Sequence, residues 1–283
     1  MLGNISSINN SILNINPLIS SVSLTESTSL KQPTAEEYNV LAGLYKSKNL
    51  NKKVIDCYSK ALLSQESTFG LLHKKTANSY NNLADAYAND GSRLQALNLY
   101  IKALNIWEKL FDLNHPQIAN IYGKMANIHF EDNNFEKAQS LYKKALDIRI
   151  KQLGEEHVQT ALSYQELAYF YATSEEYELA LPLFQKAVKI RRELLKMSHP
   201  DTATSYNNLA ICYYHLFEYE KAYECLDTAI QIRSLIFDST DSVLISAKKN
   251  LKEIEKHITQ QKKERFFSFL VKLFTSNKQI TSI

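Results

Sequence analysis

Residues 80–87 read Tyr-Asn-Asn-Leu-Ala-Asp-Ala-Tyr, and versions of this stretch recur every 42 residues along the 283-residue chain. The first tyrosine of the stretch returns in five copies, at Tyr38, Tyr80, Tyr122, Tyr164 and Tyr206. The first alanine keeps the same register, at Ala42, Ala84, Ala126, Ala168 and Ala210. A pattern with a period of about 20–50 residues indicates stacked units that bury their apolar faces against one another. We therefore expect a solenoid.

The spacing of apolar residues within one copy is helical. One stripe consists of Tyr80, Leu83, Ala84 and Tyr87, and a second of Ala96, Tyr100, Ala103, Leu104 and Trp107. Positions i, i+3, i+4 and i+7 share one face of a helix, and residues 89–92, Asn-Asp-Gly-Ser, supply a turn between the stripes. Each unit is therefore predicted to be two antiparallel helices, and no stretch alternates like a strand. The five predicted units are 31–72, 73–114, 115–156, 157–198 and 199–240.

The pattern resembles the tetratricopeptide repeat, whose helices carry aromatic-x-x-Leu-Ala-x-x-Tyr and Ala-x-x-x-Tyr-x-x-Ala-Leu. The usual period of that repeat is about 34 residues. The 42-residue period, the Asn-Asn-Leu-Ala stretches and the His-Pro pairs at 115–116 and 199–200 are similar to the kinesin light chain type, as is Pro182 early in a second helix. The resemblance implies an all-α, right-handed solenoid without enzymatic activity. It also implies a concave groove that binds a peptide or helix of a partner protein.

In this family the first helix of each unit lines the groove. The residues on this face vary from copy to copy, and many of them are amides. These are Asn78, Asn81, Asn82, Asn120, Asn127, Gln165, Asn207 and Asn208. An amide offers both a donor and an acceptor, so it can pair with the backbone of an extended peptide, while Tyr169 and Tyr214 would add apolar contacts. The alternative is a compositional bias, because residues 1–30 are also rich in Asn. Lys124 is the only cation on this face, which disfavours a basic clamp for acidic peptides.

The segment that follows the five units is predicted to be a degenerate capping helix, residues 241–261. Its apolar stripe consists of Leu244, Ala247, Leu251, Ile254 and Ile258. Residues 262–283 form a basic amphipathic tail whose predicted apolar face carries Phe266, Phe269, Leu270, Leu273 and Phe274. This face is shorter than the ~20 residues that span a bilayer. Two interpretations remain: the tail packs on the last repeat, or it binds a membrane surface or a partner.

The first 30 residues contain no Lys or Arg and a single acidic residue, Glu26. They are rich in Asn and Ser, which are mediocre helix formers. We expect a disordered leader that can fold over the first repeat, with a short coiled coil as the alternative because Ile and Val recur at spacings of 3–4. The absence of a basic segment argues against a secretory signal.

Charge and motifs exclude several functions. The net charge is +3, but it resides in the tail, so the repeats are close to neutral and lack the basic surface that nucleic-acid binding requires. No phosphate loop, nucleophile motif or paired-carboxylate motif is present. We expect no catalytic residue and no cofactor. The partner is predicted to be a protein or peptide, with membrane contact by the tail as a further possibility.

Histidines and cysteines are predicted to be structural. His73, His115, His157 and His199 recur every 42 residues, but adjacent repeats are offset by ~10 Å, far more than the ~2 Å of a zinc–ligand bond. The His-Pro pairs suit the start of a helix. Cys57, Cys212 and Cys225 have no metal or redox spacing. We therefore expect no metal site and a reducing, cytoplasmic location, with peripheral membrane association as the alternative.

Overall fold

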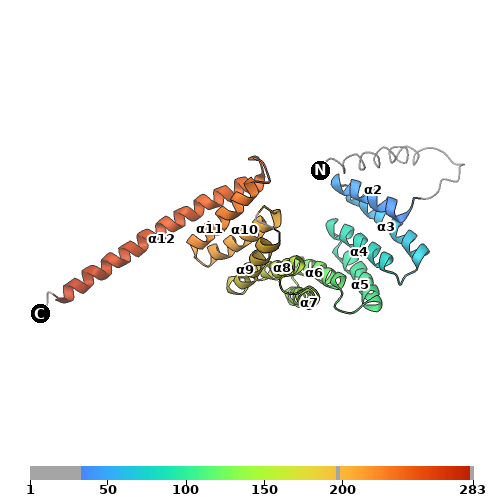
Figure 1. Cartoon of the computed structure of the whole chain (residues 1–283), viewed down its shortest axis with the longest axis horizontal. Coiled ribbons are helices and arrows are strands. Elements are labelled where there is room, and N and C mark those ends of the chain that lie inside the picture. The colour runs from blue at the N-terminus through green and yellow to red at the C-terminus, as the bar shows by residue number, and fades with distance from the viewer. Residues whose placement is uncertain (1–32, 196–197, 281–283) are drawn as a thin grey trace.

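The structure is a computed structural model that describes residues 33–195 and 198–280, with side chains up to Ser268. All regular elements in these ranges are helices (Figure 1). They are α2 (Ala35–Ser47), α3 (Asn51–Phe69), α4 (Lys74–Asn89), α5 (Arg93–Leu110), α6 (Pro116–Glu131), α7 (Phe135–Leu153), α8 (Val158–Thr173), α9 (Tyr177–Leu194), α10 (Pro200–His215), α11 (Tyr219–Ser234) and α12 (Ser242–Ile280). The predicted leader, residues 1–30, lies outside the described residues.

Consecutive helices pack in pairs, and the pairs stack. Helices α2 and α3 form repeat 1, and the pairs that follow form repeats 2 to 5, ending with α10 and α11. The second helix of each repeat also packs against the first helix of the next, and α12 packs against α11. Figure 1 shows the pairs following one curved path from α2 to α12. The prediction of an all-α solenoid of helix pairs is confirmed.

The turn inside each repeat uses one residue in the left-handed region. It falls at the same position in all five repeats, at Asn49, Gly91, Asn133, Glu175 and Phe217, with φ between 55° and 81°. The next N–H bonds back to a carbonyl five residues earlier, as Ser92 does to Tyr87 at 2.9 Å. This pattern closes the C-terminus of a helix and favours glycine, because a Cβ atom is disfavoured in this conformation.

The start of each first helix in repeats 2 to 5 is capped by histidine. Nδ1 of the capping histidine accepts the backbone N–H two residues ahead at 3.1–3.2 Å, in His73, His115, His157 and His199. Proline follows as the first helical residue at Pro116 and Pro200, a position where its missing N–H is not needed. The prediction that the His-Pro pairs begin helices is confirmed.

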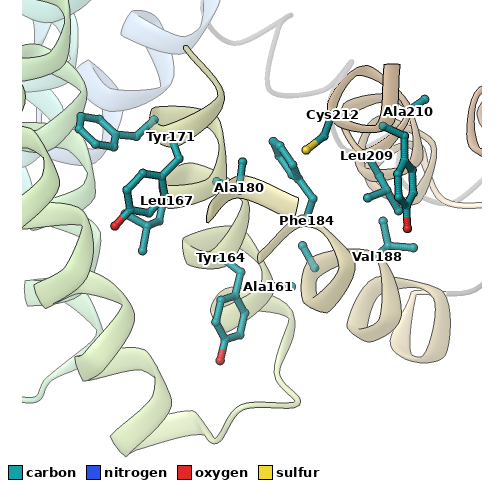
Figure 2. Packing of buried hydrophobic residues seen from close by; sticks show 14 of the residues in the cluster. Ala161, Tyr164, Leu167, Tyr171, Ala180, Phe184, Val188, Leu209, Ala210 and Cys212 are labelled. Atoms are coloured by element: carbon teal, nitrogen blue, oxygen red, sulfur yellow. The ribbon is translucent and has the colours of Figure 1, made fainter. Parts of the chain in front are cut away.

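The core runs across the repeat boundaries. The alanine column of the second helices is fully buried at Ala61, Ala103, Ala145 and Ala187, which lets neighbouring helix backbones approach closely. Figure 2 shows Tyr164, Leu167 and Phe184 of repeat 4 together with Leu209 and Cys212 of repeat 5. Each repeat therefore completes its core with its neighbour, as a solenoid requires.

The predicted capping helix and tail are one continuous helix, α12, of 39 residues. Its first half carries the predicted stripe: Leu244 and Ile254 are buried, and Leu251 and Ile258 pack against the core. Asp241 starts the helix by accepting the N–H of Leu244 at 2.8 Å. A terminal helix with one apolar face is what shields the last repeat of a solenoid.

The second half of α12 extends beyond repeat 5 (Figure 1). Phe266 and Phe267 are 60% and 66% exposed, so at these residues the tail does not pack on the last repeat. Figure 1 shows α12 continuing past α11 without a bend, so its second half projects away from the stacked repeats. The side chains of Phe269, Leu270, Leu273 and Phe274 lie outside the described ones.

Candidate partner-binding surface

Side chains on one face of α4, α6, α8 and α10 touch from repeat to repeat. Lys124 Nζ on α6 donates to Asp85 on α4 at 2.7 Å and to Asn81 at 3.3 Å. Ser205 on α10 donates to Gln165 on α8 at 3.3 Å. We call this face, which carries the column from Asn81 to Asn207 and its neighbours, the first-helix surface. Several residues predicted to line the groove are thus brought onto one continuous surface.

Between α6 and α8, the carboxylate of Glu166 lies next to Gly123. A Cβ atom at Gly123 would lie 3.3 Å from the carboxylate of Glu166. The absence of a side chain at position 123 therefore makes room for Glu166, and the two helices approach closely at this point.

In repeats 2 and 3 the polar groups of this surface are held by tyrosines from the second helices. Tyr100 donates to Asp85 at 2.5 Å, and Tyr142 donates to Asn127 at 2.5 Å. Burial, reinforced by nearby carboxylates, raises the pKa of both phenols, so they remain donors at neutral pH. Asp85 thus accepts hydrogen bonds from Tyr100 and from Lys124, and the acceptors that the two tyrosines contact are already engaged within the chain.

Two buried arginines beneath the surface were not among the predicted residues. Arg149 on α7 is 2% exposed and donates to Ser163 at 2.6 Å, and Arg191 on α9 is 3% exposed and donates to Ser205 at 2.6 Å. Arg191 also donates to Gln165. The bonds to Ser163 and Ser205 tie the second helix of one repeat to the first helix of the next, whereas the bond to Gln165 lies within repeat 4.

A signal for these arginines is present in the sequence. Positions 107, 149 and 191 form one 42-residue column, and positions 121, 163 and 205 form the column that faces it. Arginine is matched by serine in the second and third pairs, whereas Trp107 is matched by Ile121, and both of these residues are buried. Comparing facing columns, rather than single columns, would have identified the pairing.

Glu166 is the charged partner of Arg149, with Nη1 and Oε2 3.5 Å apart. Burial raises the pKa of Glu166, and the attraction of Arg149 lowers it only in part. Burial likewise lowers the pKa of Arg149 despite Glu166. Both shifts disfavour the charged forms, so the loss of hydration outweighs the attraction within the pair.

Toward α12 the surface becomes apolar. The tyrosine column continues as Phe184 and Leu226, which have no hydroxyl, and the positions opposite carry Tyr169 and Ile211, 53% and 46% exposed. A pocket of about 260 Å³ follows. It is lined by Asn207, Ala210, Ile211, Tyr214 and His215 of α10, Leu226 of α11, and Asn250, Glu253 and Ile254 of α12.

The predicted amide residues fall into two groups. Asn81, Asn127 and Gln165 accept hydrogen bonds from Lys124, Tyr142, and Arg191 with Ser205. The remaining five have no side-chain hydrogen bond to a described residue: Asn78, Asn82, Asn120, Asn207 and Asn208. Of the two predicted aromatics, Tyr169 is exposed beside Phe130, and Tyr214 lies 3.1 Å from His257 Nε2 of α12.

Two other kinds of site are absent from the described part of the chain. The described residues hold no cluster of three or more His, Cys, Asp or Glu side chains suited to a metal ion. A helix able to cross a bilayer is likewise not found within residues 33–195 and 198–280. Cys57, Cys212 and Cys225 are free thiols, and the first two are buried.

Comparison with known proteins gives one family. A tetratricopeptide repeat model matches residues 75–151, 117–193 and 159–234, with starts 42 residues apart. No curated protein matches the chain in sequence.

Solved structures of similar fold include BtubC (BKLC) from P. vanneervenii, with TM-score 0.63 and 25% identity over 71% of this chain and 80% of that one. A putative kinesin light chain repeat protein from Podosopora anserina has TM-score 0.60 and 23% identity over 70% and 94%. Aspartyl phosphate phosphatase F from Bacillus subtilis has TM-score 0.67 and 15% identity over 84% and 60%, a likeness of fold alone. The predicted likeness to kinesin light chain repeats is therefore confirmed for the fold.

Proposed function

Because the chain belongs to the tetratricopeptide repeat family, we propose that it is a non-enzymatic scaffold that binds a peptide or helix of another protein on the first-helix surface. The observation that carries this proposal is the continuity of that surface across repeats 2 to 5, from Lys124 on Asp85 to Ser205 on Gln165. Solenoids use such extended surfaces to bind partners.

The free amides are the residues we assign to the partner's backbone. Asn207 and Asn208 are half-buried on α10. Their side chains have no hydrogen bond to a described residue, so a ligand can pair with them without displacing such a contact. Asn81 and Gln165 would first have to give up Lys124 and Arg191. The net gain from a hydrogen bond is only about 0.5–1.5 kcal/mol, and for this reason free groups contribute more to binding than engaged ones.

The test uses a matched pair of variants of the full chain. Asn207→Ala with Asn208→Ala removes two free amides from the first-helix surface, and Asn98→Ala with Asn105→Ala removes two exposed amides from α5. Proteins retained by tagged wild-type chain are identified by mass spectrometry, and the affinity of each is then measured with purified partner. We expect the first variant to lose about tenfold or more in affinity, from two bonds at ~1 kcal/mol each, and the second to bind normally. The reverse result would place the partner on the second helices.

A second candidate, a peripheral membrane adaptor, is supported by the exposed phenylalanines of α12. At 3.6 residues per turn, Phe266 lies about 80° around the helix from the middle of the stripe that covers repeat 5, and Phe267 lies on the opposite side of the helix. Both side chains are exposed, 60% and 66%. Three basic residues, Lys262, Lys263 and Arg265, adjoin them in the sequence. Each would add ~1 kcal/mol of attraction to an anionic membrane surface.

Vesicle flotation tests this candidate. Full chain should float with vesicles of phosphatidylcholine and phosphatidylserine, less so at high salt, and chain ending at Gln261 should not. Phe266→Ala with Phe267→Ala should reduce flotation, whereas Leu94→Ala, at a site 70% exposed on α5, should not. Equal flotation of all four proteins would contradict a role for the tail. A cytoplasmic location, predicted from the free cysteines, stays a prediction.

A further inference from the structure

We propose that the pocket between α10, α11 and α12 is a subsite for one bulky aliphatic side chain of the partner peptide, next to a lysine or arginine of that peptide. This inference rests on the proposed function and specifies which end of the first-helix surface selects the partner, and by what chemistry. The pocket, about 260 Å³, is smaller than the ~300–1,000 Å³ of sites for drug-sized ligands. It therefore suits a single side chain.

The repeat itself shows why the pocket is open here. The same place between repeats 1 and 2 is lined by Lys46, Val54, Tyr58, Asn82, Asp85 and Ala86 among others, and it measures only 40 Å³. Four periods later, Tyr58 becomes Leu226 and Ala86 becomes Ile254. In repeats 2 and 3 the ring at this position reaches the first helix and donates its hydroxyl. Leucine has neither ring nor hydroxyl, so the space above Leu226 is left unfilled.

The floor of the pocket is apolar. Leu226, Ala210 and Ile254 are 3%, 2% and 5% exposed, and Ile211 stands at the side, 46% exposed. An aliphatic side chain entering here removes its own surface and that of Ile211 from water, which is the main source of affinity at such sites.

The polar residues at the rim of the pocket determine which peptide residues can lie next to the bound aliphatic side chain. Asn207 and Asn250 line the pocket from opposite helices, and neither amide has a hydrogen bond to a described residue, so both can pair with peptide backbone. Glu253 is the one carboxylate among the lining residues, which include no Lys or Arg. Lys256 at 2.8 Å and His257 at 3.9 Å, both on α12, face Glu253. The hydrogen bond from Lys256 lowers the pKa of Glu253, so Glu253 is ionised at neutral pH. Its ion pair with Lys256 is exposed, with side chains 74% and 55% accessible, and such pairs contribute little stability, so a cation on the peptide can share or replace Lys256 at this carboxylate.

The experiment pans a phage library of random peptides against the full chain. Enriched peptides are synthesised with a fluorophore, and their affinities are measured by fluorescence anisotropy. We expect them to share one Leu, Ile or Met close to a Lys or Arg. Leu226→Phe fills the pocket with the residue that repeat 4 carries at this position, and it should weaken binding tenfold or more. Glu253→Gln leaves the fold untouched and should weaken binding about threefold, more at low salt than at high salt.

Two controls match these variants. Leu235→Phe adds a ring at a site 78% exposed, and Glu255→Gln removes an exposed carboxylate of α12 that does not line the pocket; both should bind like wild type. Peptides that bind Leu226→Phe and Glu253→Gln normally but fail on Asn82→Ala would overturn the subsite and leave the proposed function standing. If the library yields no binding peptide, both are wrong. If light scattering shows a dimer that Leu226→Phe converts to monomer, and no peptide competes, the occupant is a second copy and the peptide subsite is refuted.

Discussion

Replacing Arg149 by methionine should destabilise the middle of the solenoid by about 2–3 kcal/mol. The side chain is 2% exposed, donates to Ser163 at 2.6 Å and lies 3.5 Å from Glu166. Methionine keeps much of the volume but leaves the carboxylate of Glu166 without its hydrogen-bonded cation, and only the attraction of Arg191 remains. Removing one member of a buried pair costs about 3–5 kcal/mol. We place the effect below that range because the Glu166 side chain is still 22% exposed.

The double variant Arg149→Met with Glu166→Gln should recover most of the loss. Burial raises the pKa of Glu166 and lowers that of Arg149 even with the partner present. Both shifts favour the neutral forms, so the charged pair adds little net stability over a neutral pair. Repeat 2 has Trp107 at the position that corresponds to Arg149, so the fold does not require a cation at this position. The defect of the single variant is therefore the unpaired carboxylate and not the lost guanidinium.

Urea unfolding followed by circular dichroism measures both variants against Lys143→Met, an exposed site on the same helix that should change stability by less than about 0.5 kcal/mol. The reasoning fails if Arg149→Met is as stable as that control. It also fails if the double variant is no more stable than the single one, since the cost would then come from lost packing.

Three further predictions concern the core and the cap. Ala145→Leu should cost about 1–3 kcal/mol in urea unfolding, because the site is fully buried between helices and overpacking forces them apart; unchanged stability would refute the assigned register. Removing residues 241–283 should expose Leu226 and cause aggregation in light scattering, whereas a monomer of full stability would show that the cap is dispensable. The hydrogen bond from Arg233 lowers the pKa of Asp241, so the stability that Asp241 contributes is present above its unfolded pKa of ~3.9 and is lost as the pH falls through the lower folded value. The melting temperature of wild type should thus drop more steeply below about pH 4 than that of Asp241→Asn, and parallel pH profiles would contradict this.

The fold could be predicted from sequence because the buried positions are the ones that repeat. The alanine column of the second helices is buried in all five copies and keeps its residue type, at Ala61, Ala103, Ala145, Ala187 and Ala229. The repeat pattern could not predict that the capping helix and the tail form one continuous helix, α12. The apolar stripe changes its face between Ile258 and Phe266, and a change of face looks the same in sequence as a break between two helices.

The candidate site was predicted only in part. The sequence indicates which positions of the first helices face the surface. It does not indicate which side chains hydrogen-bond to one another, because each partner depends on the residue that the next repeat carries. Asn81 is engaged because Lys124 stands 43 residues further along the chain. The residue at the same distance from Asn207 is Asn250, and neither of these two amides has a side-chain hydrogen bond to a described residue. The two buried arginines were not predicted for the same reason, because the role of each depends on the serine that faces it in the next repeat.

The backbone is nearly the same at every repeat, so the place where a partner binds is decided by the side chains of a few columns. In repeats 2 and 3, Tyr100 and Tyr142 already donate to Asp85 and Asn127, and a ligand that pairs with either of these acceptors must break one hydrogen bond for each that it forms, with little net gain. In repeats 4 and 5 the same column has lost its hydroxyls, and Tyr169 and Ile211 stand half exposed with apolar area to bury. Such area contributes about 25 cal/mol per Å², with no bond to break first. The loss of two hydroxyls along one column therefore moves the favourable end of the surface toward α12, without any change of fold.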